Sequence, residues 1–112
     1  MYNKELTKGT LKPIILKLIS ESEKMYGYEI TQEVKKLTSG KIDISEGALY
    51  PILHKFEANG LLTTEKVFIG KRVRKYYTIT NSGLEEVLKM SEELNDFIET
   101  LHLIFNPKII LE

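Results

Sequence analysis

The hydrophobic pattern of this 112-residue chain changes its period near Gly60 and changes back near Gly83. Up to Gly60, apolar residues recur every three or four positions, which is typical of amphipathic helices. From Leu61 to Ile79 the chain is instead rich in β-branched and aromatic residues around a Gly70-Lys71-Arg72 turn, which indicates a β-hairpin. After Gly83 the helical spacing returns. The chain must therefore fold as helices, a hairpin and a further helix, in that order.

Capping and stop signals divide the helical parts into four expected helices. Ser, Thr and Asn favour helix starts, and Gly or Pro favours helix ends. The expected helices run from the N-cap Thr10 to residues 22–24, from Tyr28 to Leu37, from the N-cap Ser45 to Asn59, and from residues 80–83 to about Phe105. The expected strands are Leu61–Ile69 and Val73–Ile79. This order predicts an α+β fold, mainly α. It is the order of a winged helix-turn-helix domain with an added C-terminal helix, although many other small α+β domains share it.

Composition excludes most catalytic chemistry. The chain has no cysteine and only two histidines, His54 and His102, which lie far apart in the sequence. It contains no phosphate-binding glycine loop, nucleophile elbow or zinc-protease motif. We therefore expect no enzyme, no metal site and no cofactor. No apolar run is long enough to span a membrane and no signal peptide is evident, so we expect a cytoplasmic protein that binds no membrane.

The charges cancel in number but are unevenly distributed. Basic and acidic residues number 16 each. Residues 1–40 hold seven basic and five acidic residues, residues 41–80 hold seven and four, and residues 81–112 hold two and seven. The first two segments are therefore basic and the last is acidic, which indicates that they have different partners.

The third expected helix has an unusual outward face. Pro51 lies well inside it and removes the hydrogen bond to the carbonyl of Gly47, at a typical cost of about 3 kcal/mol. Opposite the apolar stripe lie small or uncharged residues where a solvated helix usually carries Lys and Glu. Such a face favours close approach to a surface such as a DNA major groove, although a kinked surface helix explains it equally well.

The hairpin carries the strongest local charge in the chain. Residues 66–77 include five basic side chains and no acidic one. Strand alternation places Arg72, Arg74 and Tyr76 on one face, where they would meet phosphates, and Lys75 and Tyr77 on the other, which would pack on the helices. Lys71 and Arg72 at the tip would reach a DNA backbone or minor groove. A hairpin kept soluble by edge lysines is the alternative.

The last expected helix has an apolar stripe with a seven-residue repeat. This stripe is wider than a lone helix at the edge of a domain can bury, which favours pairing with a second copy of the chain. Acidic residues cover most of the remaining surface and would be repelled by DNA. The alternative is a helix packed wholly on its own core. The residues expected at a dimer contact are Leu84, Val87, Leu88, Leu94, Phe97, Ile98, Leu101 and Phe105.

Several motifs together resemble the PadR family of bacterial transcriptional regulators over residues 5–105. They are Lys8-Gly9-Thr10-Leu11, Tyr26-Gly27-Tyr28-Glu29-Ile30, Gly47-Ala48-Leu49-Tyr50-Pro51-Ile52-Leu53, Gly60-Leu61-Leu62, and Arg74-Lys75-Tyr76-Tyr77-Thr78-Ile79-Thr80 with Gly83. The resemblance implies a winged helix-turn-helix DNA-binding domain over residues 1–80. It also implies a C-terminal dimerisation helix with a short tail over residues 81–112. Members of this family mostly act as homodimeric repressors that a small molecule or stress signal releases from DNA.

The resemblance also implies roles for individual residues. The third helix matches the recognition helix of the family, with Tyr50 on a phosphate and His54 and Lys55 nearest the bases or flanking backbone. The recognition-helix residues expected near DNA are Ser45, Glu46, Gly47, Tyr50, Pro51, His54 and Lys55. Those expected from the wing are Lys66, Lys71, Arg72, Arg74, Lys75 and Tyr76.

The expected partners are double-stranded DNA with an inverted-repeat operator, a second copy of the chain and a small-molecule effector between the subunits. Phe97, His102 and Phe105 would line a small apolar effector site. Two other functions stay open at this point: a winged-helix module that binds a protein, and a small-molecule sensor without direct operator binding.

Overall fold

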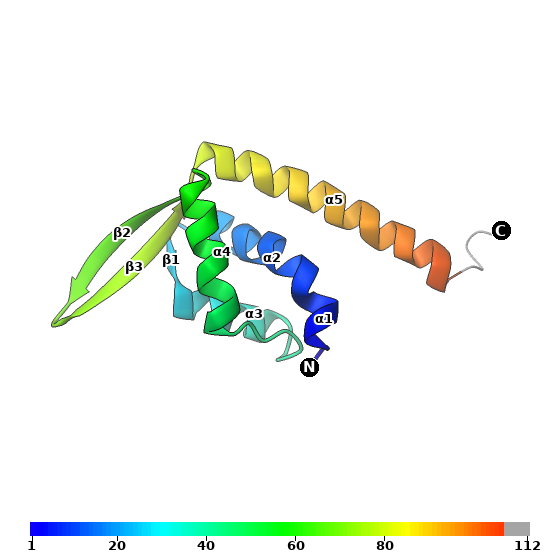
Figure 1. Ribbon diagram of the computed structural model, residues 1–112, viewed down its shortest axis with the longest axis horizontal. Helices are drawn as coiled ribbons and strands as arrows, with labels where there is room; N and C mark the ends of the chain where they lie inside the picture. The colour runs from blue at the N-terminus through cyan, green and yellow to red at the C-terminus, as the bar shows by residue number, and fades with distance from the viewer. Residues whose placement is uncertain (107–112) are drawn as a thin grey trace.

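The computed structural model describes residues 1–106 and has the expected order of helices, hairpin and helix (Figure 1). It is mainly helical with a small antiparallel sheet, as the α+β expectation required. The elements are α1 Lys4–Thr7, the 3₁₀ turn η1 Lys8–Thr10, α2 Leu11–Ser20, β1 Met25–Tyr26, α3 Gly27–Leu37, α4 Glu46–Ala58, β2 Leu62–Ile69, β3 Arg72–Ile79 and α5 Asn81–Phe105. The residues after 106, including the expected short tail, lie outside the described part.

Side-chain caps explain where the third and last helices begin. Ser45 precedes α4, and its hydroxyl accepts a hydrogen bond from the Ala48 backbone N–H at 3.2 Å. Thr80 precedes α5 and accepts from the Gly83 N–H at 3.0 Å in the same way. Thr10 is the residue before α2, but its hydroxyl donates back to the Thr7 carbonyl and caps nothing. Thr10 therefore occupies the expected N-cap position without the side-chain hydrogen bond of a cap, because η1 already leads into the helix.

The hairpin closes with a two-residue turn. Ile69 pairs with Arg72, so only Gly70 and Lys71 lie between the strands. Gly70 has φ +62°, a conformation that glycine adopts without strain at the first position of such a turn. Arg72 is thus the first residue of β3 and lies inside the ladder, one residue earlier than the sequence indicated.

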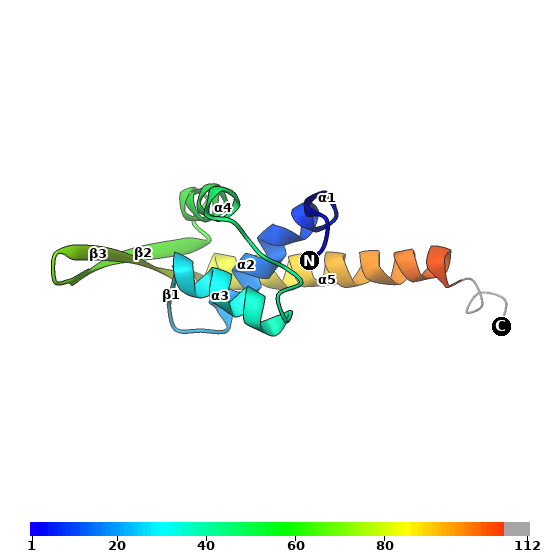
Figure 2. The same cartoon turned by 90° about the horizontal axis from the view of Figure 1, so that it is seen from below.

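The sheet has three strands in the order β1-β3-β2. The two-residue strand β1 pairs with the base of β3, through Met25 with Tyr77 and Tyr26 with Tyr76. The rest of the hairpin extends beyond β1, away from the helices, as Figures 1 and 2 both show. Figure 2 places α4 on one side of the hairpin and α3 with β1 on the other.

A single apolar core joins the helices to the base of the sheet. Its side chains are Ile15, Leu16, Ile19, Met25, Ile30, Val34, Ile44, Leu49, Leu53, Phe56, Leu62, Tyr77 and Val87. α5 packs on α2. Its residue Gly83 lies against the base of the hairpin, where a Cβ would collide with the Leu61 carbonyl and the Ile79 side chain. None of the helices in the described part of the chain combines the length and hydropathy that a membrane crossing requires.

Candidate nucleic-acid interface

All seven residues expected near DNA on α4 are exposed. The helix buries Leu49, Leu53 and Phe56, and these three anchor it to the core. The opposite side consists of Ser45, Glu46, Gly47, Tyr50, Pro51, His54 and Lys55. α4 continues through Pro51 to Ala58, so the proline shapes the surface without ending the helix. At Gly47 an added Cβ would meet only the Ser45 hydroxyl, at 4.0 Å, so this part of the face is open.

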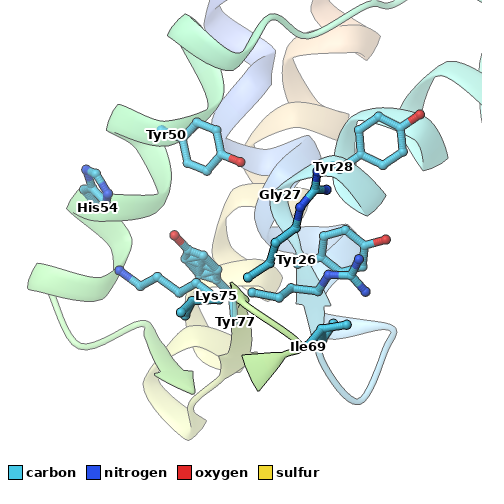
Figure 3. A pocket seen from close by; sticks show the side chains of 11 residues that line it. Tyr26, Gly27, Tyr28, Tyr50, His54, Ile69, Lys75 and Tyr77 are labelled. Atoms are coloured by element: carbon cyan, nitrogen blue, oxygen red, sulfur yellow. The ribbon is translucent and has the colours of Figure 1, made fainter. Parts of the chain in front are cut away.

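Tyr50 connects α4 to the start of α3. Its ring lies directly against Gly27, the first residue of α3, and a Cβ added there would be 2.5 Å from the Tyr50 hydroxyl oxygen. Figure 3 shows the hydroxyl directed from α4 towards this first turn. Gly27 is buried, while Tyr50 keeps 37% of its surface exposed. The glycine therefore makes room for a tyrosine whose other side faces solvent.

The wing residues fall into two groups. Lys66, Lys71 and Arg72 are exposed. Arg74 and Tyr76 are half-buried beside β1: the Arg74 guanidinium lies 3.9 Å from the centre of the Tyr26 ring, and the Tyr26 and Tyr76 rings meet edge to face at 5.5 Å. Cation–π contacts of this kind orient a guanidinium while leaving its hydrogen-bond donors available.

Lys75 is held by an acidic partner on α4. Its ammonium lies 3.2 Å from one carboxylate oxygen of Glu57, and the Thr64 hydroxyl donates to the other oxygen at 2.9 Å. Both hydrogen bonds lower the pKa of Glu57, and the one from Thr64 has the larger effect. This contact joins α4 to both long strands and confirms that the Lys75 face of the hairpin packs towards the helices.

A cleft of about 510 Å³ separates α4, the start of α3 and the hairpin (Figure 3). Its lining residues are Tyr26, Gly27, Tyr28, Tyr50, His54, Ile69, Arg72, Val73, Arg74, Lys75 and Tyr77. These side chains include two guanidiniums and one ammonium but no carboxylate. The cleft is therefore suited to an anionic occupant.

The cleft brings only part of the expected set together. Tyr50 and His54 of α4 meet Arg72, Arg74 and Lys75 of the wing there. The other expected residues, namely Ser45, Glu46, Gly47, Pro51, Lys55, Lys66, Lys71 and Tyr76, lie outside its lining. Tyr26, Gly27 and Tyr28 also line the cleft, although no DNA-binding role was predicted for them. The available signal was Gly27, because a glycine permits the close approach of another chain segment.

The residues expected at a dimer contact lie on α5, and seven of the eight have exposed or half-exposed side chains. From Asn95 to Asn106 every residue is exposed, so this half of the helix projects beyond the core. Phe97, Ile98 and Phe105 are 55%, 45% and 76% exposed. Val87 differs, because it is 6% exposed and belongs to the protomer's own core.

The three residues expected at an effector site do not share one groove. His102 and Phe105 border a shallow groove of about 230 Å³ together with Ile98 and Leu101. Phe97 lines a separate groove of about 300 Å³ with Pro13, Met90 and Leu94, between α2 and α5. Within one protomer the expected three-residue site is therefore divided.

Comparison with known proteins identifies relatives over most of the chain. The model of the transcriptional regulator PadR-like family matches residues 15–89. A transcriptional regulator of Mycobacterium tuberculosis is 34% identical over 94 residues, which cover 81% of this chain and 84% of the relative. A transcriptional regulator of Clostridium thermocellum has a similar structure, with a TM-score of 0.81 at 26% identity over 91% of this chain and 96% of the other.

One solved structure includes nucleic acid. It is Bacillus subtilis PadR in complex with operator DNA, which matches with a TM-score of 0.65 at 30% identity over 71% of this chain and 45% of that one. The fold, the family match and these relatives agree with the sequence resemblance and with the expectation of a regulator rather than an enzyme. The chain belongs to the PadR-like family of transcriptional regulators.

Proposed function

We propose that this chain is a cytoplasmic, homodimeric repressor that binds an inverted-repeat operator and leaves it when a small-molecule or stress signal is sensed. Residues 1–80 would bind DNA, and residues 81–112 would hold the dimer together. The observation that carries the proposal is the combination of an exposed, nearly uncharged α4 face with an acid-free cationic cleft beside it. The operator complex of the Bacillus subtilis relative supports the same choice of ligand.

The α4 face has the dimensions and chemistry that a major groove accepts. Gly47 and Pro51 keep the side chains short, so the helix backbone would approach the bases closely. His54 and Lys55 would then reach base edges or the flanking backbone, and Ser45 and Glu46 would lie at the helix start, where many recognition helices make their contacts. Tyr50, held by Gly27, would place its hydroxyl on a phosphate bordering the groove.

The wing would add contacts that depend on charge more than on sequence. Lys66, Lys71 and Arg72 are exposed and would bind phosphates on either side of the wing. Arg74 would reach the backbone from its position over Tyr26. Lys75 and Tyr76 would act from the base of the wing. Lys75 lies beside Glu57, and the ring centre of Tyr76 lies 4.7 Å from the ammonium of Lys24.

Dimerisation would use the apolar stripe of α5. The exposed half of this helix carries large apolar side chains that water would otherwise surround. Pairing would bury Leu84, Leu88, Leu94, Phe97, Ile98, Leu101 and Phe105, whereas Val87 would support the helix from within the protomer. The two grooves on α5 would close on pairing, and the effector would bind between the subunits there.

Two measurements on the purified protein test this proposal. Light scattering gives the mass of the particle, which should be twice 12.9 kDa. Selection from random duplex oligonucleotides at about 0.1 M salt, where screening limits nonspecific binding, should enrich an inverted repeat. A dimer that enriches no sequence would instead support a protein-binding module or a small-molecule sensor. Calorimetry with aromatic acids and lipophilic cations would then test the sensor.

A further inference from the structure

The tip of the wing exposes apolar side chains where a solvated hairpin would carry charges. Phe68 is 74% exposed and Val73 is 51% exposed, and they pair directly across the two strands. Phe68 belongs to β2, an edge strand of the sheet. Exposed apolar residues on an edge strand promote aggregation, and proteins usually place lysines there instead. A cross-strand contact stabilises a hairpin slightly, but a threonine or tyrosine pair would do so without this liability.

The Phe68–Val73 pair lies on the face of the wing that looks towards α4. Side chains alternate along a strand, so Phe68 shares a face with Thr64, and Val73 shares it with Lys75. Thr64 and Lys75 are the two hairpin residues whose side chains contact Glu57 of α4. The apolar pair is therefore on the same side of the wing as the exposed recognition face, at the far end from the core.

Cations lie near this apolar pair on both faces of the wing. Lys66 shares the strand and face of Phe68, Lys71 belongs to the turn, and Arg72, the first residue of β3, lies on the opposite face. No acidic residue occurs between Lys66 and Lys75. An apolar centre with a basic border complements the DNA minor groove, where phosphates line both edges, the sugar walls are largely apolar and an apolar side chain can insert between stacked bases.

We propose that Phe68, backed by Val73, enters the minor groove beside each half-site and partly unstacks a base step there. The inference rests on the proposed DNA-binding function and adds a contact that the basic residues alone do not supply. Lys66, Lys71 and Arg72 hold the backbone on either side while the phenyl ring contacts the base step. The partner is double-stranded DNA, because the basic border attracts phosphates. The same border would repel basic protein surfaces, including a second copy of this tip.

This contact makes the protein sensitive to DNA outside the sequence that α4 reads. Pyrimidine–purine steps such as TA and CA unstack more easily than other steps. The operator should therefore prefer such a step at the position of the wing, on the outer side of each half-site. The preference arises from the energy of deforming the DNA and needs no hydrogen bond to a base.

Phe68→Ala tests the contact directly. The dissociation constant for the enriched operator is measured at several salt concentrations, together with the DNA bend from fluorescence energy transfer across the site. We expect Phe68→Ala to weaken binding roughly tenfold. The bend should decrease and the flanking-step preference should disappear, while the salt slope stays unchanged because no phosphate contact is lost. Phe68→Leu should retain most of the affinity, because it keeps an apolar side chain.

Two further variants make the result specific. Arg72→Ala should reduce the salt slope by about one phosphate contact and preserve the flanking-step preference. Val67→Ala lowers the strand propensity of the same hairpin on its opposite face, so it should bind the operator like the wild-type protein. If Val67→Ala weakens binding as much as Phe68→Ala does, the hairpin's stability and not the ring is responsible, and the proposal is wrong.

Other outcomes also separate this proposal from the function on which it rests. If the wild-type protein binds no DNA, the proposed function fails first. If wild-type binding is specific but Phe68→Ala equals it in affinity and bend, only the minor-groove contact is overturned. A change in particle mass in Phe68→Ala would show that the tip joins copies of the protein, which also overturns it.

Discussion

At the scale of single residues, Gly27 and Tyr50 link the start of α3 to the exposed face of α4. The Tyr50 ring occupies the space where any side chain at position 27 would begin. Gly27→Ala would therefore displace the far end of the tyrosine, which is partly exposed and free to swing outwards. We expect the thermal midpoint to change little, because the ring can move outwards at low cost, and we expect operator affinity to fall.

A double-mutant cycle shows whether Gly27 acts through Tyr50. Fluorescence titrations give operator affinity for Gly27→Ala, Tyr50→Ala and the double variant. The double variant should bind no more weakly than Tyr50→Ala alone, since the alanine at position 27 then has nothing to displace. Additive losses would show that Gly27 contributes separately and would contradict this account.

Glu57 gives the fold a pH dependence whose sign follows from its partners. Hydrogen bonds from Thr64 and Lys75 lower its pKa below the ordinary value of 4.5. A carboxylate with a lowered pKa in the folded state stabilises the protein above its unfolded pKa, and this stabilisation is lost as the pH falls through the folded pKa. Glu57→Gln should therefore be less stable than the wild-type protein at pH 7, and the difference should shrink below about pH 4.

Urea unfolding at pH 7 and at pH 3 measures this difference at one protein concentration. Glu65→Gln is the matched control, because it removes the same charge from an exposed position of the same hairpin. It should change the free energy of unfolding much less than Glu57→Gln at pH 7. A difference between Glu57→Gln and wild type that persists undiminished at pH 3 would mean that the carboxylate's charge is not what stabilises the contact.

At the scale of elements, α5 has one part that belongs to the core and one that is left in solvent. Leu101 lies on the apolar stripe, while Leu103, two residues on, lies about 200° away around the helix. Both are leucines with exposed surface, so they form a matched pair. We expect Leu101→Glu to dissociate the proposed dimer and Leu103→Glu to leave it intact, as measured by light scattering across a concentration series. Equal masses for the two variants would exclude this stripe as the dimer contact.

The long elements were predictable from the sequence because each has a strong local signal. The bounds of α3, α4, β2 and α5 follow within a few residues from hydrophobic period, N-caps and glycine stops. β1 was missed because two residues carry no measurable alternation, and its pairing with β3 depends on a contact about 50 residues away. α1 was missed because four residues without a buried side chain give no apolar stripe.

The candidate site was predictable in its residue types and less so in its contacts. Exposure of the α4 face followed from the helical wheel. The proximity of Tyr50 to Gly27, and of Lys75 to Glu57, depends on how α3 and the hairpin pack against α4. Such distances are set by tertiary packing, which no local pattern specifies. Val87 shows the same limit: its heptad position matched a dimer stripe, yet it belongs to the buried core of its own protomer.

At the scale of the whole molecule, the wing and α5 extend in opposite directions from the core (Figure 2). The Cα trace measures 62 × 30 × 20 Å, so the tip of the wing and the C-terminal half of α5 lie at opposite ends of an elongated protomer, with α4 over the core between them. This separation would keep the acidic C-terminal half of α5 away from DNA bound at the wing. In the proposed dimer, two protomers joined through α5 would present their α4 faces to successive major grooves, which lie about 34 Å apart on one side of a duplex.

Guanine methylation protection on the enriched operator tests this arrangement most directly, because methylation at N7 reports contacts in the major groove. The account predicts two protected patches related by the inverted repeat, about 10 base pairs apart on one face of the DNA. Arg72→Ala should weaken both patches equally as binding falls, without moving them. A single protected patch, or two patches on opposite faces of the duplex, would contradict a dimer that reads DNA with paired copies of α4.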